Sequence, residues 1–77
     1  MPPLLITAVE EPGFTIYLEP EGAEHMVTVG QRVSIALPTG TGHVELSWVP
    51  SGLIIGRDPN ADDYPTLTDQ HGRTLDW

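Results

Sequence analysis

The sequence predicts a small all-β domain, an antiparallel β-sandwich or partly open barrel of about six to eight short strands. Eight Gly and eight Pro interrupt the chain too often for a long helix. The segments between them are short and rich in Val, Ile, Thr, Leu and Tyr, and several alternate apolar and polar residues with the period of two that a half-buried strand requires. The length of 77 residues fits a single domain, residues 1–77.

The first half of the chain contains four predicted strands: Leu4–Glu10, Phe14–Glu19, His25–Val29 and Arg32–Leu37. Pro12 and Gly13 end the first of them, since this dipeptide favours a turn. Gly30 and Gln31 predict a two-residue hairpin between the third and the fourth strand, because glycine tolerates the positive φ that such a loop needs at its first position.

The second half contains four more: His43–Val49, Leu53–Ile55, Thr66–Thr68 and Arg73–Leu75. Leu53–Ile55 is uniformly apolar, which suits a central strand. The last two strands are predicted to pair as a hairpin in which Gly72 takes the left-handed position of a bulged turn. An irregular acidic loop, residues 57–65, precedes this hairpin.

The alternating strands also predict a core. We expect these inward-facing side chains to be buried: Val33, Ile35, Leu37, Val44, Leu46 and Trp48. If Leu46 is fully packed, Leu46→Ala should cost about 2–5 kcal/mol of unfolding free energy. A sandwich this thin leaves little room for a pocket of about 300 Å³ or more.

Charge is the strongest signal in the composition. The chain has 11 Asp and Glu, three Arg and no Lys, and a formal net charge of -8. Such a surface repels nucleic-acid phosphates and anionic membranes, and it favours a basic protein or a metal ion. The alternative is that negative charge only keeps a small protein soluble. Because the sequence shows neither a long apolar run nor the features of a signal peptide, we expect a cytoplasmic protein.

Catalytic patterns are weak. None of the serines, Ser34, Ser47 and Ser51, stands in a Gly-x-Ser-x-Gly turn, so we expect no enzyme. His43 and Glu45 lie two residues apart on one strand face and are candidates to bind a metal together. A zinc site needs at least one further protein ligand, which the spacing does not supply.

The most specific local pattern is a candidate calcium loop. Asp58, Asn60 and Asp62 alternate, and Asp69 follows eleven residues after Asp58. This spacing resembles positions 1, 3, 5 and 12 of an EF-hand loop, whose ligands are hard oxygens. Position 6 is Asp63 instead of Gly, position 12 is Asp instead of Glu, and no flanking helix is predicted. We therefore expect no cofactor and favour a turn in which Asp58 and Asn60 bond to their own backbone; Ca²⁺ at this loop is the alternative.

The remaining candidates are contacts with a protein partner: Trp77, Tyr17, Asp62 and Asp63. The leading hypothesis is a non-enzymatic acidic protein-binding module, in concrete form an inhibitor or immunity-type protein for a basic partner. One alternative is a structural β subunit that self-assembles through a sheet edge, for example as a homodimer. The other is a small metal- or ligand-binding β domain that uses the 58–69 acidic loop.

Overall fold

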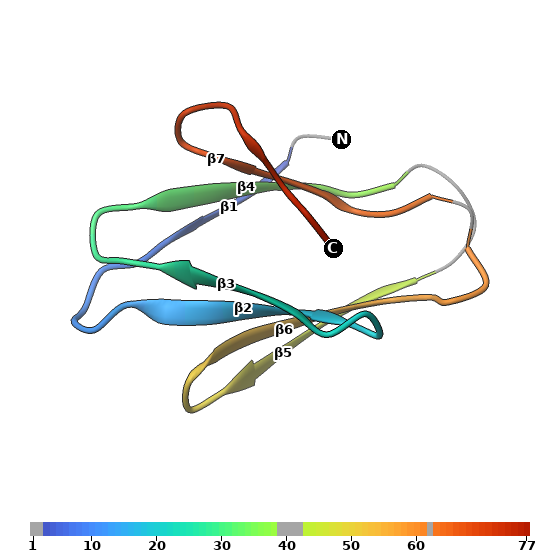
Figure 1. Cartoon of the computed structure of the whole chain (residues 1–77), viewed down its shortest axis with the longest axis horizontal. Coiled ribbons are helices and arrows are strands. Elements are labelled where there is room, and N and C mark those ends of the chain that lie inside the picture. The colour runs from blue at the N-terminus through green and yellow to red at the C-terminus, as the bar shows by residue number, and fades with distance from the viewer. Residues whose placement is uncertain (1–2, 39–42, 62) are drawn as a thin grey trace.

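Two four-stranded sheets lie face to face in a computed structural model, which describes residues 3–38, 43–61 and 63–77 (Figure 1). The strands are β1 (Leu4–Thr7), β2 (Phe14–Glu19), β3 (Ala23–Val27), β4 (Arg32–Ala36), β5 (Val44–Val49), β6 (Gly52–Arg57), β7 (Thr66–Asp69) and β8 (Thr74–Leu75). The all-β prediction is confirmed. Within these ranges no helix is long and apolar enough to cross a membrane.

The sheets combine local hairpins with distant pairings. One sheet has the order β1-β4-β7-β8, and the other has the order β3-β2-β6-β5. The pairs β2–β3, β5–β6 and β7–β8 are antiparallel hairpins, and the last of them is the hairpin that the sequence analysis predicts. The pair β2–β6 is parallel, with Glu19 opposite Gly56, and no local pattern predicts it.

The predicted hairpin at Gly30 and Gln31 is wrong, because β3 and β4 belong to different sheets. Gln31 N donates to Thr28 O over 2.9 Å, and Gly30 has a φ of 89°. The tight turn therefore exists, but it carries the chain from one sheet to the other. Positive φ at glycine serves both purposes equally well, so it does not distinguish them.

The buried core comes from both sheets and consists of Ala8, Ile16, Leu18, Val27, Val33, Ile35, Leu53, Ile55 and Leu67. The prediction was right for Val33 and Ile35, whereas Val44 is only partly buried. It was wrong for Leu37, Leu46 and Trp48.

The inner face of β5 explains this error. Leu46 lies opposite Ile55 and Trp48 lies opposite Leu53, so both side chains share the inner face of the sheet, as the alternation predicts. However, β5 is an edge strand, and nothing in the described ranges covers its inner face fully: Leu46 is 43% and Trp48 is 67% exposed. Alternation identifies the face of a strand, but not whether the opposite sheet extends over it.

Gly52 permits the parallel pairing of β2 with β6. It is buried at the start of β6, and a Cβ atom built there would overlap the carbonyl oxygen of Thr15 in β2. Only glycine allows such a close approach of two backbones.

Candidate functional site

Carboxylates gather at one end of the sandwich, which we call the acidic end and define by Glu19, Glu21, Asp58 and Asp63. Because β2 and β6 run parallel, their carboxyl ends lie together, and the segments that follow them meet there (Figure 1). Glu19 ends β2, Glu21 lies in the turn after it, and Asp58 and Asp63 lie in the segment after β6. Turns separated by more than thirty residues in the sequence thus form one acidic surface.

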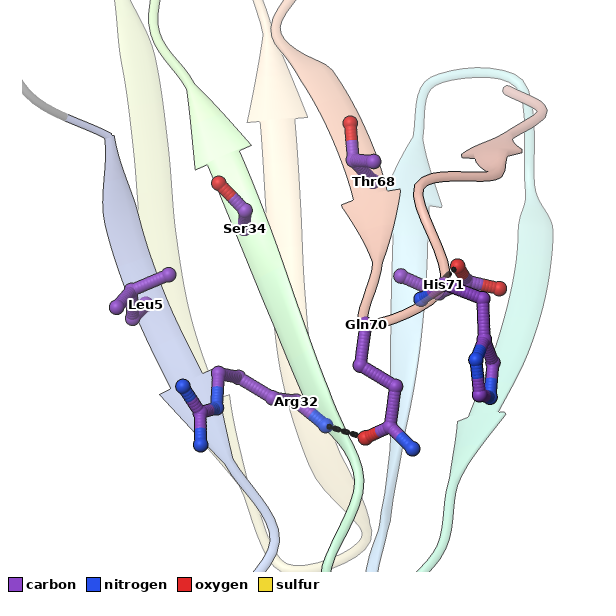
Figure 2. Close-up of a pocket in the computed structure, with 7 residues that line it drawn as sticks. Leu5, Arg32, Ser34, Thr68, Gln70 and His71 are labelled. Atoms are coloured by element: carbon purple, nitrogen blue, oxygen red, sulfur yellow. Dashed lines mark hydrogen bonds between the residues drawn. The ribbon is translucent and has the colours of Figure 1, made fainter.

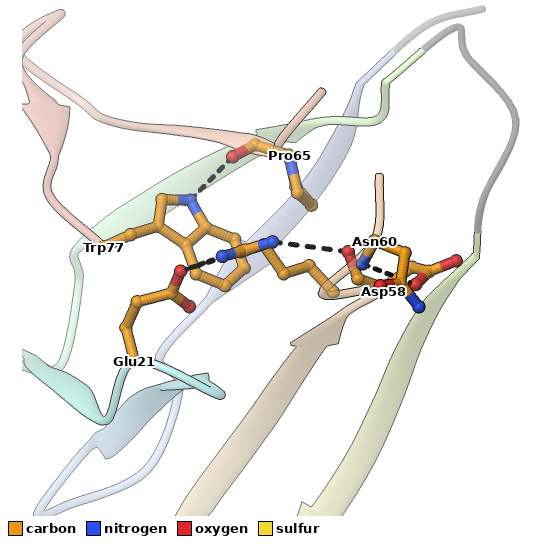
Figure 3. A network of polar contacts seen from close by, with 6 residues as sticks. Glu21, Asp58, Asn60, Pro65 and Trp77 are labelled. Carbon is orange, nitrogen blue, oxygen red and sulfur yellow. Dashed lines mark hydrogen bonds and ion pairs between the residues drawn. The ribbon is translucent and has the colours of Figure 1, made fainter. Parts of the chain in front are cut away.

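Arg57 joins the two segments of the acidic end. Its guanidinium donates to one carboxylate oxygen of Glu21 through Nε, over 2.8 Å, and through a terminal nitrogen, and its other terminal nitrogen donates to Asp58 O over 3.3 Å (Figure 3). The same guanidinium lies 3.9 Å from the centre of the Tyr64 ring. Only 10% of its side chain is exposed, so Arg57 holds the two segments together and is not a free cation at the surface.

The contact with Glu21 changes the pKa values of both groups. Hydrogen bonds from Arg57 hold the pKa of the Glu21 carboxyl below its ordinary value, and the Glu21 carboxylate raises the pKa of Arg57 further. Both groups therefore stay ionised at neutral pH. Because this arginine is already paired, the exposed carboxylates of Glu19 and Asp63 remain to attract an external cationic group.

We predict that acid weakens the fold through this contact. Glu21 has a lowered pKa in the folded state, so its stabilising contribution is complete above its ordinary pKa of 4.5. That contribution is lost as the pH falls through the lowered folded-state pKa. In melting curves measured from neutral to acidic pH, Glu21→Gln should lower Tm at neutral pH and flatten its decline on the acid side. Glu10→Gln, at an exposed position at the opposite end, is the control; an equal decline in all three proteins would contradict the prediction.

The structure separates the residues of the candidate calcium loop. Asp58 Oδ1 accepts a hydrogen bond of 2.9 Å from Asn60 N, which is the local turn that the sequence offered as the alternative (Figure 3). Asp69 lies at the far end of β7, where its carboxylate accepts bonds from the backbone N–H groups of His71 and Arg73. These bonds, the Arg73 backbone N–H first, lower the pKa of Asp69. Asp62 lies outside the described residues, and Ca²⁺ binding stays an untested alternative.

His43 faces two carboxylates, but through different ring nitrogens. Its Nδ1 lies 3.8 Å from Asp58 Oδ2, and its Nε2 lies 3.7 Å from Glu45 Oε1. A metal bound to either ring nitrogen would thus have only one of these carboxylates beside it, whereas a zinc site needs at least three protein ligands. No group of three or more metal-binding side chains is found in residues 3–38, 43–61 and 63–77.

The predicted aromatic contacts both have partners within the chain. Trp77 is partly buried against the core, and its ring N–H donates to Pro65 O over 2.8 Å (Figure 3). Tyr17 shares a hydrogen bond of 2.6 Å with Ser51 Oγ. Trp77 therefore covers part of the core, and the Tyr64 ring packs against it edge to face, with 5.8 Å between the ring centres.

Tyr64 and Trp48 are surface aromatic residues that the sequence analysis did not select as contacts. Tyr64 is 45% exposed at the acidic end, next to Asp63, and Trp48 is exposed on β5. The signal for Tyr64 was its position within an acidic loop that follows a strand. For Trp48 the alternation favoured the core, so only the structure reveals its exposure.

A polar hollow of about 530 Å³ lies on the outer face of the sheet that contains β4 and β7. It is larger than the sequence led us to expect, because it is an open surface depression and not a space within the core. Its lining residues are Leu5, Arg32, Ser34, Thr68, Asp69, Gln70 and His71 (Figure 2). Arg32 N donates to Gln70 Oε1 over 3.2 Å. The Asp69 carboxylate is occupied by Arg73 and by backbone N–H groups, so it does not orient His71 as a catalytic base would require.

Comparisons with protein-family models, with curated proteins and with solved structures found no match to this chain.

Proposed function

We propose that this chain is a non-enzymatic protein-binding module that attracts a basic partner protein to its acidic end. The observation that carries the proposal is that the exposed carboxylates Glu19 and Asp63 lie at the same end of the sandwich, next to a guanidinium that Glu21 already occupies. A local excess of carboxylates over arginines raises the rate of encounter with a cationic surface. Tyr64 supplies an exposed aromatic surface next to these charges, where a partner side chain can be desolvated.

The two ends of the sandwich differ in charge. The opposite end carries Glu10, Glu11 and Asp69, and it also carries Arg32 and Arg73. Its acids and bases nearly balance, and Arg73 pairs with Asp69 directly. A basic partner would therefore meet the acidic end first. In its most concrete form the partner is a basic nuclease, whose active site the acidic end would cover in the manner of an immunity protein.

The test compares two double variants that remove the same charge from opposite ends. Basic proteins captured from an extract of the source cells are first identified, and association rates are then measured by stopped flow at low and high ionic strength. We expect Glu19→Gln with Asp63→Asn to slow association by roughly tenfold at low ionic strength, because electrostatic steering of this kind changes rates by about 10- to 1,000-fold. High ionic strength should remove the difference.

The matched control is Glu10→Gln with Glu11→Gln, which should leave the association rate nearly unchanged. If both double variants slow association equally, net charge alone is responsible and the acidic end is not the site. A partner that is itself acidic, or an association rate indifferent to salt, would also contradict the proposal.

A further inference from the structure

Exposed apolar side chains lie along one side of the sandwich, where the edge strand β1 of one sheet is next to the edge strand β5 of the other. We call this region the open edge and define it by Leu4, Leu37, Leu46 and Trp48. A cavity of about 200 Å³ lies here between Leu4 of β1 and Leu46 of β5, with Leu37, Pro38 and Val44 completing its lining. Trp48 continues the apolar surface and packs edge to face against Phe14, with 6.1 Å between ring centres.

The other side of the sandwich differs, because the C-terminal segment covers it. His25 in β3 donates from Nε2 to Asp76 O, and Leu75 and Trp77 pack against the core. Of the edge strands, β8 has two residues, β1 has four, β3 has five and β5 has six. Edge strands are usually protected by Lys, by Pro or by short length, and β5 contains neither residue within Val44–Val49.

The hydrogen bonds of β5 show which of its backbone groups are free. Asp58 N donates to His43 O over 3.1 Å, and hydrogen-bonded positions alternate along an antiparallel pair. Glu45 and Ser47 thus direct their N–H and C=O groups toward β6. The backbone groups of Val44, Leu46 and Trp48 point away from β6, toward the outside of the sheet.

We propose that a second copy of this chain pairs with β5, antiparallel and about a two-fold axis at Leu46. In this register Leu46 faces its own copy, Val44 faces Trp48, and Glu45 faces Ser47. The free backbone N–H groups of Val44, Leu46 and Trp48 in one copy then each donate a hydrogen bond to a free C=O group of these residues in the other copy. Apolar residues stand opposite apolar ones on the inner face, and no two like charges stand opposite each other on the outer face.

This palindromic pattern, apolar-polar-apolar-polar-apolar about Leu46, is what favours a copy of the same chain over an unrelated strand. The surface area also agrees with a dimer. The four residues of the open edge leave on the order of 400 Å² of apolar surface exposed in each copy, so the pair would bury about 800 Å² from them alone. The backbone of β5 and its outer face bring the total toward the range of about 1,200–2,000 Å² found in stable interfaces.

Salt should affect the dimer and the binding of a basic partner in opposite directions, so experiments can reject one of these proposals without rejecting the other. Each copy carries a net charge of -8, so two copies repel each other at low ionic strength. Salt screens this repulsion and should tighten the dimer, whereas it should weaken binding of a basic partner.

The first test is sedimentation velocity of the full chain from about 1 μM to about 1 mM, the range of weak to moderate homodimers. We expect a concentration-dependent dimer that strengthens with salt. Trp48→Ala should weaken it by roughly tenfold or more, as loss of a central aromatic contact does. Met26→Ala is the matched control, since Met26 is 66% exposed but lies on β3. A chain that stays monomeric throughout overturns the proposal and leaves the open edge to a strand of another protein.

The second test fixes the register. The chain has no cysteine, so Leu46→Cys introduces its only thiol. Directly opposite hydrogen-bonded residues have Cα atoms about 5.5 Å apart, within disulfide range. Mild oxidation with oxidised glutathione should thus link Leu46→Cys rapidly into a covalent dimer. Ser47→Cys, which is also exposed on β5 but faces Glu45, should link much more slowly. Equal rates for both variants, or a Trp48→Ala dimer as strong as that of the wild type, would overturn the proposed pairing.

Discussion

Gly52→Ala is expected to destabilise the fold by more than about 3 kcal/mol, beyond the usual cost of overpacking. The added Cβ would overlap the Thr15 carbonyl oxygen, which belongs to the backbone of β2 and cannot rotate away. To accommodate it, β2 and β6 must separate at the parallel pairing that links the two hairpins of their sheet. Urea unfolding followed by circular dichroism measures the loss.

Gly56→Ala is the control for this prediction, because it makes the same substitution in the same strand. A Cβ at Gly56 would meet its nearest atom at 3.9 Å, which is ordinary van der Waals contact. We expect the unfolding free energy to change by no more than about 1 kcal/mol. Any gain in stability would come from the lower conformational entropy of the unfolded chain, because alanine is less flexible than glycine. Similar losses for both variants would show that glycine matters in β6 for a reason other than close backbone approach.

Ile55→Ala and Leu46→Ala form the second pair of expected results. The two residues lie directly opposite each other in β6 and β5, on the same face of one sheet. Ile55 is fully buried between the sheets, so its truncation should cost about 2–5 kcal/mol. Leu46 is 43% exposed, so its truncation should cost less than about 1 kcal/mol, well below the value that the sequence alone suggested.

The unfolding of both variants should be measured at protein concentrations where the chain is monomeric. There, equal losses would mean that the inner face of β5 is covered as fully as that of β6. At higher concentration the proposed dimer adds a second contribution. The stability of the wild type should then rise with protein concentration by mass action, and that of Leu46→Ala should rise less.

The strands themselves were predictable, because their periodicity is local. Phe14–Glu19 matches β2 to the residue, and Arg32–Leu37 exceeds β4 by one residue. Other boundaries were less accurate. The predicted strand Leu4–Glu10 ends at Thr7, and the predicted strand His25–Val29 is shifted to Ala23–Val27. Strand ends depend on where a partner strand stops, which a single segment does not encode.

The arrangement of the strands was not predictable from local signals. Glycine at position 30 gives the same turn whether the next strand pairs with its neighbour or crosses to the other sheet. The acidic end depends on the parallel alignment of β2 with β6, so the sequence showed the acidic turns but not which of them meet. Asp69 was expected to act with Asp58, and the length of β7 places it at the other end.

The order of the strands also has a consequence for folding on the ribosome. The sheet β1-β4-β7-β8 draws on both the first and the last described strands, and β2 acquires its parallel neighbour only after residue 52 has been made. To form such distant pairings, the chain must lose the entropy of closing large loops before the new contacts stabilise it. Folding is therefore slow compared with that of a helical chain of the same length. Strands β2 and β4 therefore each lack one of their two partner strands until synthesis has passed β6 and β7, respectively, and this is the period in which chaperones would bind the nascent chain.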